Sequence, residues 1–168
     1  MAIEGLDVAE DERKDGPGRF AKAARALGFE PAIKEFEVPT RTAEEAAAAC
    51  GATVGEIVKS LVFKGKKSGI PMMFLVSGVN RVDQKGVAAL IGEPLDRPDG
   101  QFVRDLTGFA IGGIPPFGHD TPLKSFIDED LLAFAGVWAA AGSPNSVFPI
   151  TPAELQRLAK ATPMRVKE

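Results

Sequence analysis

Hydrophobic and polar residues alternate through the segment EIVKSLVFKG, residues 56–65. Such alternation is typical of a β-strand, in which successive side chains point to opposite faces of the sheet. Lys59 therefore shares one face with three large apolar side chains, those of Ile57, Leu61 and Phe63. A lysine on an apolar face needs an anion or several hydrogen-bond acceptors to replace its lost water. The pattern predicts a strand and a specific partner for Lys59.

The same patterns divide the rest of the chain into short elements. Helical spacing and capping residues predict helices at residues 19–27, 42–50, 83–90, a shorter one ending at 106, and 151–161. Apolar runs and alternation predict strands at residues 35–38, 56–63, 71–78, 123–128 and 137–141, and a strand that runs into a turn at residues 109–113. The sequence GKKSG predicts a turn that joins the second and third strands as a hairpin, and the unbroken apolar run of the third suits a central strand. The elements interleave without regular βαβ spacing, so we expect an α+β fold with a mixed, mostly antiparallel sheet and packed helices.

The first part of the chain differs in composition from the remainder. Residues 1–16 are charged and carry too little apolar surface to repay ordering, which predicts a flexible tail before one domain at residues 17–168. This segment also lacks the apolar core of a secretory signal, and no stretch reaches membrane-spanning length. We therefore expect a cytoplasmic protein with no membrane partner.

Charge and composition narrow the chemistry. The net charge of −3 argues against a protein that coats nucleic acid by bulk positive charge, so any such contact is local. The single cysteine, Cys50, excludes an internal disulfide framework, and a small buried thiol is its simplest interpretation. With one histidine, His119, a multi-histidine metal centre is not expected either. We predict no metal and no organic cofactor.

A second unusual segment is FAIGGIPPFGHD, residues 109–120. Paired glycines after a strand let a ligand or another segment approach the main chain closely, and Pro115 and Pro116 stiffen the loop. Such a loop can present fixed N–H groups to an anion or a developing oxyanion. An ordinary turn has the same composition, so this segment needs a second feature before it indicates a site.

The lysine strand and the glycine loop together supply that feature. EIVKSLVF, an apolar strand, LTGFAIGGIPPFGH and LKSFIDEDL follow one another in an order that resembles the YbaK/EbsC family, also called the prolyl-tRNA synthetase associated domain. The resemblance covers about residues 29–161, and its most specific parts are residues 57–62 and 107–118. It implies the YbaK-like α+β fold in a single domain.

The resemblance also implies a function. Family members hydrolyse the ester that links a wrong amino acid to tRNA, either within a synthetase or as free-standing proteins. No synthetase surrounds this domain in the sequence, so we expect a trans-editing aminoacyl-tRNA deacylase that removes a small amino acid. Its partner would be the acceptor end of a mischarged tRNA. Two alternatives stay open: a non-catalytic module that binds tRNA or a nucleotide, and a small-ester hydrolase unrelated to tRNA.

Site residues carry over from the family motifs. The strand lysine is the residue that the family most needs for activity, which makes Lys59 the catalytic candidate; it could act on the substrate phosphate, the ester carbonyl or the water. The substrate-binding candidates are Ser60, Gly108, Gly112, Gly113, Ile114, Pro116 and His119. For Ser60, packing is an alternative role. His119 is the only imidazole, but no motif places a catalytic partner beside it, so we do not expect it to be the general base.

Two acidic features leave questions open. Asp128, Glu129 and Asp130 could form a carboxylate pair, but we favour capping of the short helix that follows, with the side chains facing solvent. Some family members carry an acidic residue in the region that corresponds to residues 143–148, where this chain has none. The sequence therefore does not determine which amino acid is removed. It does not determine the oligomeric state either.

Overall fold

The computed structural model describes residues 15–168. Residues 1–14, most of the predicted tail, lie outside the described residues. Helix α2, Gly16–Ala26, begins at a cap in which the Gly18 N–H donates to Asp15 Oδ1 at 2.6 Å. Residues 15 and 16 therefore belong to this helix and its cap rather than to a tail.

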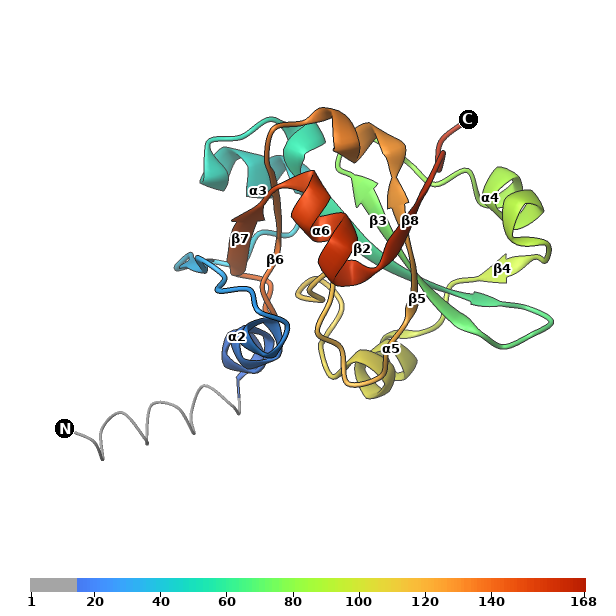
Figure 1. Cartoon of the computed structure of the whole chain (residues 1–168), viewed down its shortest axis with the longest axis horizontal. Helices are drawn as coiled ribbons and strands as arrows, with labels where there is room; N and C mark the ends of the chain where they lie inside the picture. The colour runs from blue at the N-terminus through green and yellow to red at the C-terminus, as the bar shows by residue number, and fades with distance from the viewer. Residues whose placement is uncertain (1–14) are drawn as a thin grey trace.

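Two sheets form the centre of the molecule (Figure 1). The larger has the order β4-β2-β3-β5-β8, with bounds β2 Val58–Gly65, β3 Pro71–Ser77, β4 Leu95–Asp96, β5 Lys124–Asp128 and β8 Ala161–Met164. The smaller has the order β1-β7-β6, with bounds β1 Lys34–Glu35, β6 Val137–Ala140 and β7 Ser146–Ile150. The β3–β5 and β5–β8 pairs are parallel and the other strand pairs are antiparallel. The prediction of a mixed, mostly antiparallel α+β fold is confirmed.

The remaining helices are short; α3, α5 and α6 begin at side-chain caps, whereas Asp83 lies at the start of α4 without a capping hydrogen bond from its side chain. Their bounds are α3 Ala43–Cys50, α4 Gln84–Ile91, α5 Gly100–Thr107 and α6 Pro152–Ala159, with 3₁₀ turns η1 Val54–Glu56 and η2 Glu129–Ala133. Thr42 and Thr151 accept N–H groups of the first turns of α3 and α6, as their sequences predict. None of the helices among residues 15–168 has the length and apolar character that a membrane crossing requires.

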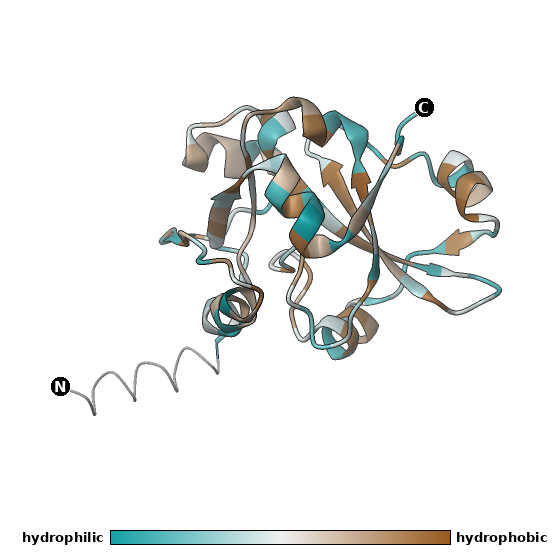
Figure 2. Ribbon diagram, in the orientation of Figure 1, coloured by the Kyte–Doolittle hydropathy of each residue, from teal (hydrophilic) through white to brown (hydrophobic). Residues whose placement is uncertain are grey.

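The side chains of β3 are buried on both faces of the larger sheet. Met73 and Leu75 pack into the main core together with residues of α2 and α6, whereas Phe74 and Val76 pack on the opposite face beside Val87 of α4. Apolar residues accordingly gather on the central strands (Figure 2). The prediction that residues 71–78 form a central strand is confirmed.

Several predicted strands differ from the structure. Residues 109–113 form a loop and not a strand, because Gly112 has φ +95° and the Gly113 N–H turns back to the Ala110 carbonyl at 3.0 Å. Near residue 36 only Lys34–Glu35 pairs, with β7. The sequence did not predict β4, β7 or β8, which are short and, in β7 and β8, contain a proline.

Candidate functional site

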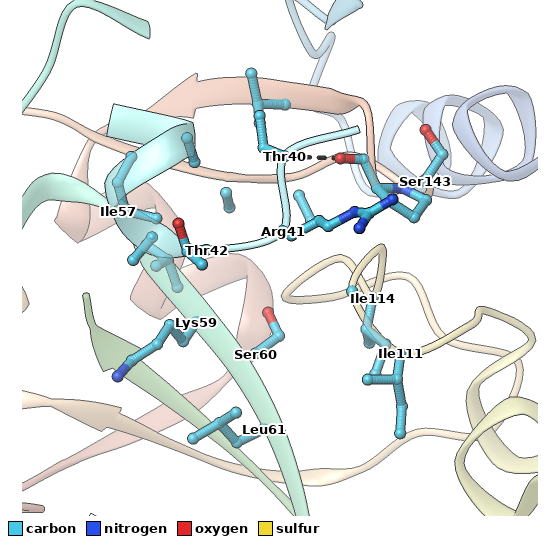
Figure 3. A pocket seen from close by; sticks show the side chains of 18 of the residues that line it. Thr40, Arg41, Thr42, Ile57, Lys59, Ser60, Leu61, Ile111, Ile114 and Ser143 are labelled. Atoms are coloured by element: carbon cyan, nitrogen blue, oxygen red, sulfur yellow. Dashed lines mark hydrogen bonds between the residues drawn. The ribbon is translucent and has the colours of Figure 1, made fainter. Parts of the chain in front are cut away.

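A cavity of about 270 Å³ lies beside the edge of β2 (Figure 3). Its other walls include the segment 40–42 and the first turn of α3, residues 97–98 after β4, the loop 111–114, and β6 with the residues that join it to β7. Thr40 ties two of these walls together, since its Oγ1 donates to the Pro144 carbonyl at 3.2 Å. Segments that are far apart in the sequence therefore enclose one space against β2.

The alternation of β2 separates its two candidate side chains. Ser60 points toward the loop that carries Ile114, whereas the Lys59 side chain points away from that loop (Figure 3). The Ser60 Oγ is buried and makes no hydrogen bond within residues 15–168. Both residues contribute atoms to the lining of the cavity. The Ser60 side chain lies on the side of the glycine loop, and the ammonium of Lys59 lies on the opposite face of the strand (Figure 3).

The predicted partner of Lys59 is a main-chain carbonyl. Its Nζ donates a short hydrogen bond to the Asn80 carbonyl oxygen, and no carboxylate of the described chain forms an ion pair with it. Burial lowers the pKa of Lys59, and the nearby Arg81 lowers it further, while Glu44 and Asp128 oppose the shift. The ammonium therefore has a neutral acceptor and stays available for a substrate anion.

A buried carboxylate holds that acceptor in place. Asp128 is only 1% exposed, and its Oδ2 accepts from Asn80 Nδ2 at 2.8 Å and from the Ser77 N–H at 3.1 Å. Its Oδ1 caps η2 by accepting the Asp130 N–H at 2.9 Å. Capping was predicted correctly, but the expectation that Asp128 faces solvent is wrong. Its place at the end of β5, beside the end of β3, buries it, and this depends on strand pairing that a linear pattern does not show.

The glycine loop packs tightly against the turn between β6 and β7. A Cβ on Gly113 would lie 2.6 Å from Ser143 Cα, so only glycine fits there. Gly112 and Ile114 line the cavity. Gly108, Gly113 and Pro116 do not line it; Gly108 ends α5 in a left-handed conformation, and Pro116 is buried behind the loop. The loop candidates thus divide into cavity residues and residues that support them.

His119 lies outside the lining of the cavity. Its Nε2 is 2.6 Å from the Pro115 carbonyl oxygen, so the ring braces the loop from behind. Burial is the main cause that lowers its pKa. This geometry supports a structural role rather than the substrate contact that the family motif suggested for His119.

We expect His119→Gln to keep deacylation within about tenfold of wild type, because a positioned general base contributes on the order of 10²- to 10⁴-fold. Since folding lowers the His119 pKa, the unfolded chain takes up the proton first as the pH falls below about 6.5. The histidine thus favours folding above that pH, and this contribution is lost on acidification. Urea denaturation at pH 7 and pH 5 should show a larger loss for wild type than for His119→Gln. A hundredfold loss of activity in the folded variant would instead make the histidine catalytic.

The cavity carries positive charge without a carboxylate. Arg41, Lys59 and Arg97 line it, and its lining includes no Asp, Glu, His or Cys. The Arg41 side chain extends between Ser143 and Ile114 (Figure 3). The sequence did not predict Arg41 or Ser143 as site residues. The residues ahead of α3 were interpreted only as a helix cap, and at the β6–β7 turn only the absence of an acidic residue from residues 143–148 was noted.

Comparisons with known proteins agree with the resemblance seen in the motifs. The aminoacyl-tRNA editing domain family matches residues 37–158. The uncharacterised protein YwhH of Bacillus subtilis is 32% identical over 123 residues, which cover 73% of this chain and 78% of YwhH. EbsC of Enterococcus faecalis, provisionally named a Cys-tRNA(Pro)/Cys-tRNA(Cys) deacylase, is 26% identical over 114 residues, which cover 66% of this chain and 68% of EbsC.

A solved structure gives the same result. It is provisionally assigned as a trans-editing enzyme for prolyl-tRNA synthetase, and it superposes with a TM-score of 0.86 at 50% identity. The match covers 90% of this chain and 96% of that one. The chain therefore belongs to the aminoacyl-tRNA editing domain family and is a hydrolase that acts on aminoacyl-tRNA.

Proposed function

We propose that the protein removes a small, uncharged amino acid from mischarged tRNA by hydrolysing its ester in the cavity beside β2. The observation that carries this proposal is the composition of the cavity: it combines Lys59 and Ser60 with the main chain of Gly112, and no carboxylate lines it. Ile57, Ile114 and Ala139 add apolar walls. An apolar enclosure of this kind favours a short neutral side chain over a charged one.

The chemistry follows from what lines the cavity. An aminoacyl ester is already activated, so its hydrolysis needs a positioned water and stabilisation of the developing oxyanion. Because no acidic, imidazole or thiol group lines the cavity, these side chains offer no general base there. The vicinal hydroxyl of the terminal ribose, which the family resemblance implies as a participant, would supply the route for the proton. This chemistry requires no metal or organic cofactor.

For Lys59, the geometry favours contact with the phosphate of the terminal nucleotide. Its side chain points away from Ser60 and from the loop that carries Ile114, where the aminoacyl group would lie (Figure 3). An ammonium on the face of β2 opposite Ser60 can pair with a phosphate while the ester enters the cavity. The acceptor end of the tRNA would thus reach the cavity from the side of Lys59.

Two relatives support action in trans. The structure at 50% identity is provisionally assigned as a trans-editing enzyme for prolyl-tRNA synthetase, and EbsC is named for cysteine attached to tRNA(Pro) or tRNA(Cys).

The β6–β7 turn offers neutral groups to the amino acid side chain, since the Ser143 and Ser146 Oγ atoms lie 2.7 Å apart in a hydrogen bond. We therefore propose alanine, serine, threonine and cysteine on tRNA as the candidate substrates.

A panel of charged tRNAs tests the proposal. Transfer RNAs carrying alanine, serine, threonine, cysteine and proline are incubated with the protein, and ester hydrolysis is compared with the uncatalysed rate. We expect accelerated release of at least one small amino acid, and no acceleration for the ethyl ester of the same amino acid. Equal acceleration on the ethyl ester would indicate a small-ester hydrolase unrelated to tRNA. No acceleration on any tRNA would overturn the proposal.

A further inference from the structure

The hydrogen bonds at the two ends of β2 show which of its residues direct their main-chain N–H and C=O groups toward β3. The Gly78 N–H donates to the Ile57 carbonyl at 2.7 Å, and the Gly65 N–H donates to the Ile70 carbonyl at 3.0 Å. In an antiparallel pair, every second residue directs both its N–H and its C=O to the partner strand. The register between β2 and β3 is unbroken from residue 58 to 64. The odd-numbered residues of β2 therefore bond to β3.

The even-numbered residues of β2 direct their main-chain groups to the opposite edge. Just beyond β2, the Lys66 N–H donates to the Pro94 carbonyl at 2.8 Å on that side, and β4 pairs with β2 at Lys64 and Gly65. At the other end, a single parallel bridge joins Ile57 to Trp138 of β6. Between these two contacts, no strand of the described chain covers the edge at Ser60.

Ser60 therefore presents three polar groups without a protein partner in residues 15–168. Its N–H and C=O point to the uncovered edge, where the cavity lies, and its Oγ is buried without a hydrogen bond. A hydrogen-bonding group that is removed from water without a partner costs about 1 to 3 kcal/mol, so an edge of this kind is suited to a ligand that completes it.

We propose that the main chain of Ser60 binds the aminoacyl group of the substrate, an inference that rests on the proposed function. The Ser60 N–H donates to the ester carbonyl oxygen, and the Ser60 carbonyl accepts from the α-amino group. An α-aminoacyl ester carries these two groups in the same spacing as a residue of an antiparallel strand, so it can pair with Ser60 as one added strand residue.

The charge of the cavity supports this assignment. A protonated α-amino group needs acceptors, and the lining provides three cationic side chains but no carboxylate. Main-chain carbonyl oxygens are then the strongest acceptors available, and the free edge of β2 supplies one beside the loop that carries Ile114. Main-chain pairing recognises the part that all α-amino acids share, so discrimination among side chains falls to the cavity walls.

Amide exchange measured by NMR on the ¹⁵N-labelled full chain tests the inference. The probe is 3′-(L-alanylamino)-3′-deoxyadenosine, a stable analogue in which an amide replaces the ester. Without the probe, we expect the Ser60 amide to exchange much faster than that of Leu61, whose N–H bonds to β3. At saturation with the probe, the Ser60 amide should slow by at least about tenfold while Leu61 changes little.

The outcomes distinguish this inference from the proposed function. If the Gly112 amide shifts on titration but exchange at Ser60 is unchanged, the probe occupies the cavity without pairing with β2, and the inference is overturned. If neither resonance responds, the cavity does not take an aminoacyl-adenosine, which overturns the proposed function and this inference with it.

A pair of variants provides a second measurement. Proline at an edge position removes the N–H that faces away from the sheet and is tolerated there, whereas alanine keeps the N–H and removes only the hydroxyl. We expect Ser60→Pro to bind the probe at least about tenfold more weakly than Ser60→Ala, as for the loss of one hydrogen bond to a polar ligand group. Equal affinities in two folded variants would contradict a role for the Ser60 N–H.

Discussion

Lys59→Ala should lower the rate of deacylation by about 10²-fold or more with only a small loss of stability. The rate falls because the only cation that β2 contributes to the cavity is lost, and with it the contact to substrate charge. Stability is largely maintained because Lys59 Nζ donates to the Asn80 carbonyl and forms no ion pair with a carboxylate of the described chain. Removing the ammonium therefore leaves no buried charge without its partner. Loss of this one hydrogen bond should lower the free energy of unfolding by about 1 kcal/mol, well below the cost of breaking a buried ion pair.

Two controls separate charge from packing and from nonspecific effects. Lys59→Met keeps most of the apolar stem and should be as inactive as Lys59→Ala. Lys85→Ala removes an exposed lysine from α4, outside the cavity lining, and should retain full activity. Chemical denaturation and single-turnover rates on the same preparations provide both quantities. A loss of about 3 to 5 kcal/mol would indicate a buried structural ion pair and would contradict the functional interpretation.

Gly113→Ala should impair both the fold and the activity. The new Cβ would lie 2.6 Å from Ser143 Cα, so the loop and the β6–β7 turn must move apart. Overpacking of this kind costs about 1 to 3 kcal/mol. The same displacement moves Gly112 and Ile114 at the cavity, and a shift of about 1 Å in a positioning element can lower a rate about 10²-fold.

Gly136→Ala is the matched control for this variant. Gly136 lies ahead of β6, and a Cβ there would meet no atom within 4 Å. We expect its melting temperature and deacylation rate to stay close to wild type. If Gly113→Ala were also as stable and as active as wild type, the close approach of the loop to Ser143 would be unimportant for the site.

The sequence predicted the elements whose information is local. Alternation located β2, an apolar run located β3, and Thr42 and Thr151 marked the starts of two helices. The edge strands β4 and β8 were missed because short segments derive their structure from the strand that they pair with. At residues 109–113 the sequence predicted a strand that runs into a turn; the turn is present, but no strand precedes it, since the composition does not show where the chain reverses.

The site could be predicted only where a motif marked it. Lys59, Ser60, Gly112 and Ile114 do line one cavity, although their roles in the reaction are proposals. Arg41 was missed because its place depends on how the segment before α3 folds across β2. The burial of Asp128 was missed for a similar reason, since parallel pairing of β5 with β3 creates it. Contacts between segments distant in sequence define both.

We propose that this cavity hydrolyses aminoacyl-tRNA and does not merely bind it. The most direct measurement follows single-turnover release of the amino acid from a tRNA charged with a small amino acid, with the protein in excess, alongside binding of the same tRNA. We expect the wild-type protein to bind this tRNA and to release its amino acid well above the uncatalysed rate. Binding by the wild-type protein without any accelerated release would contradict this proposal and would identify a non-catalytic tRNA-binding module.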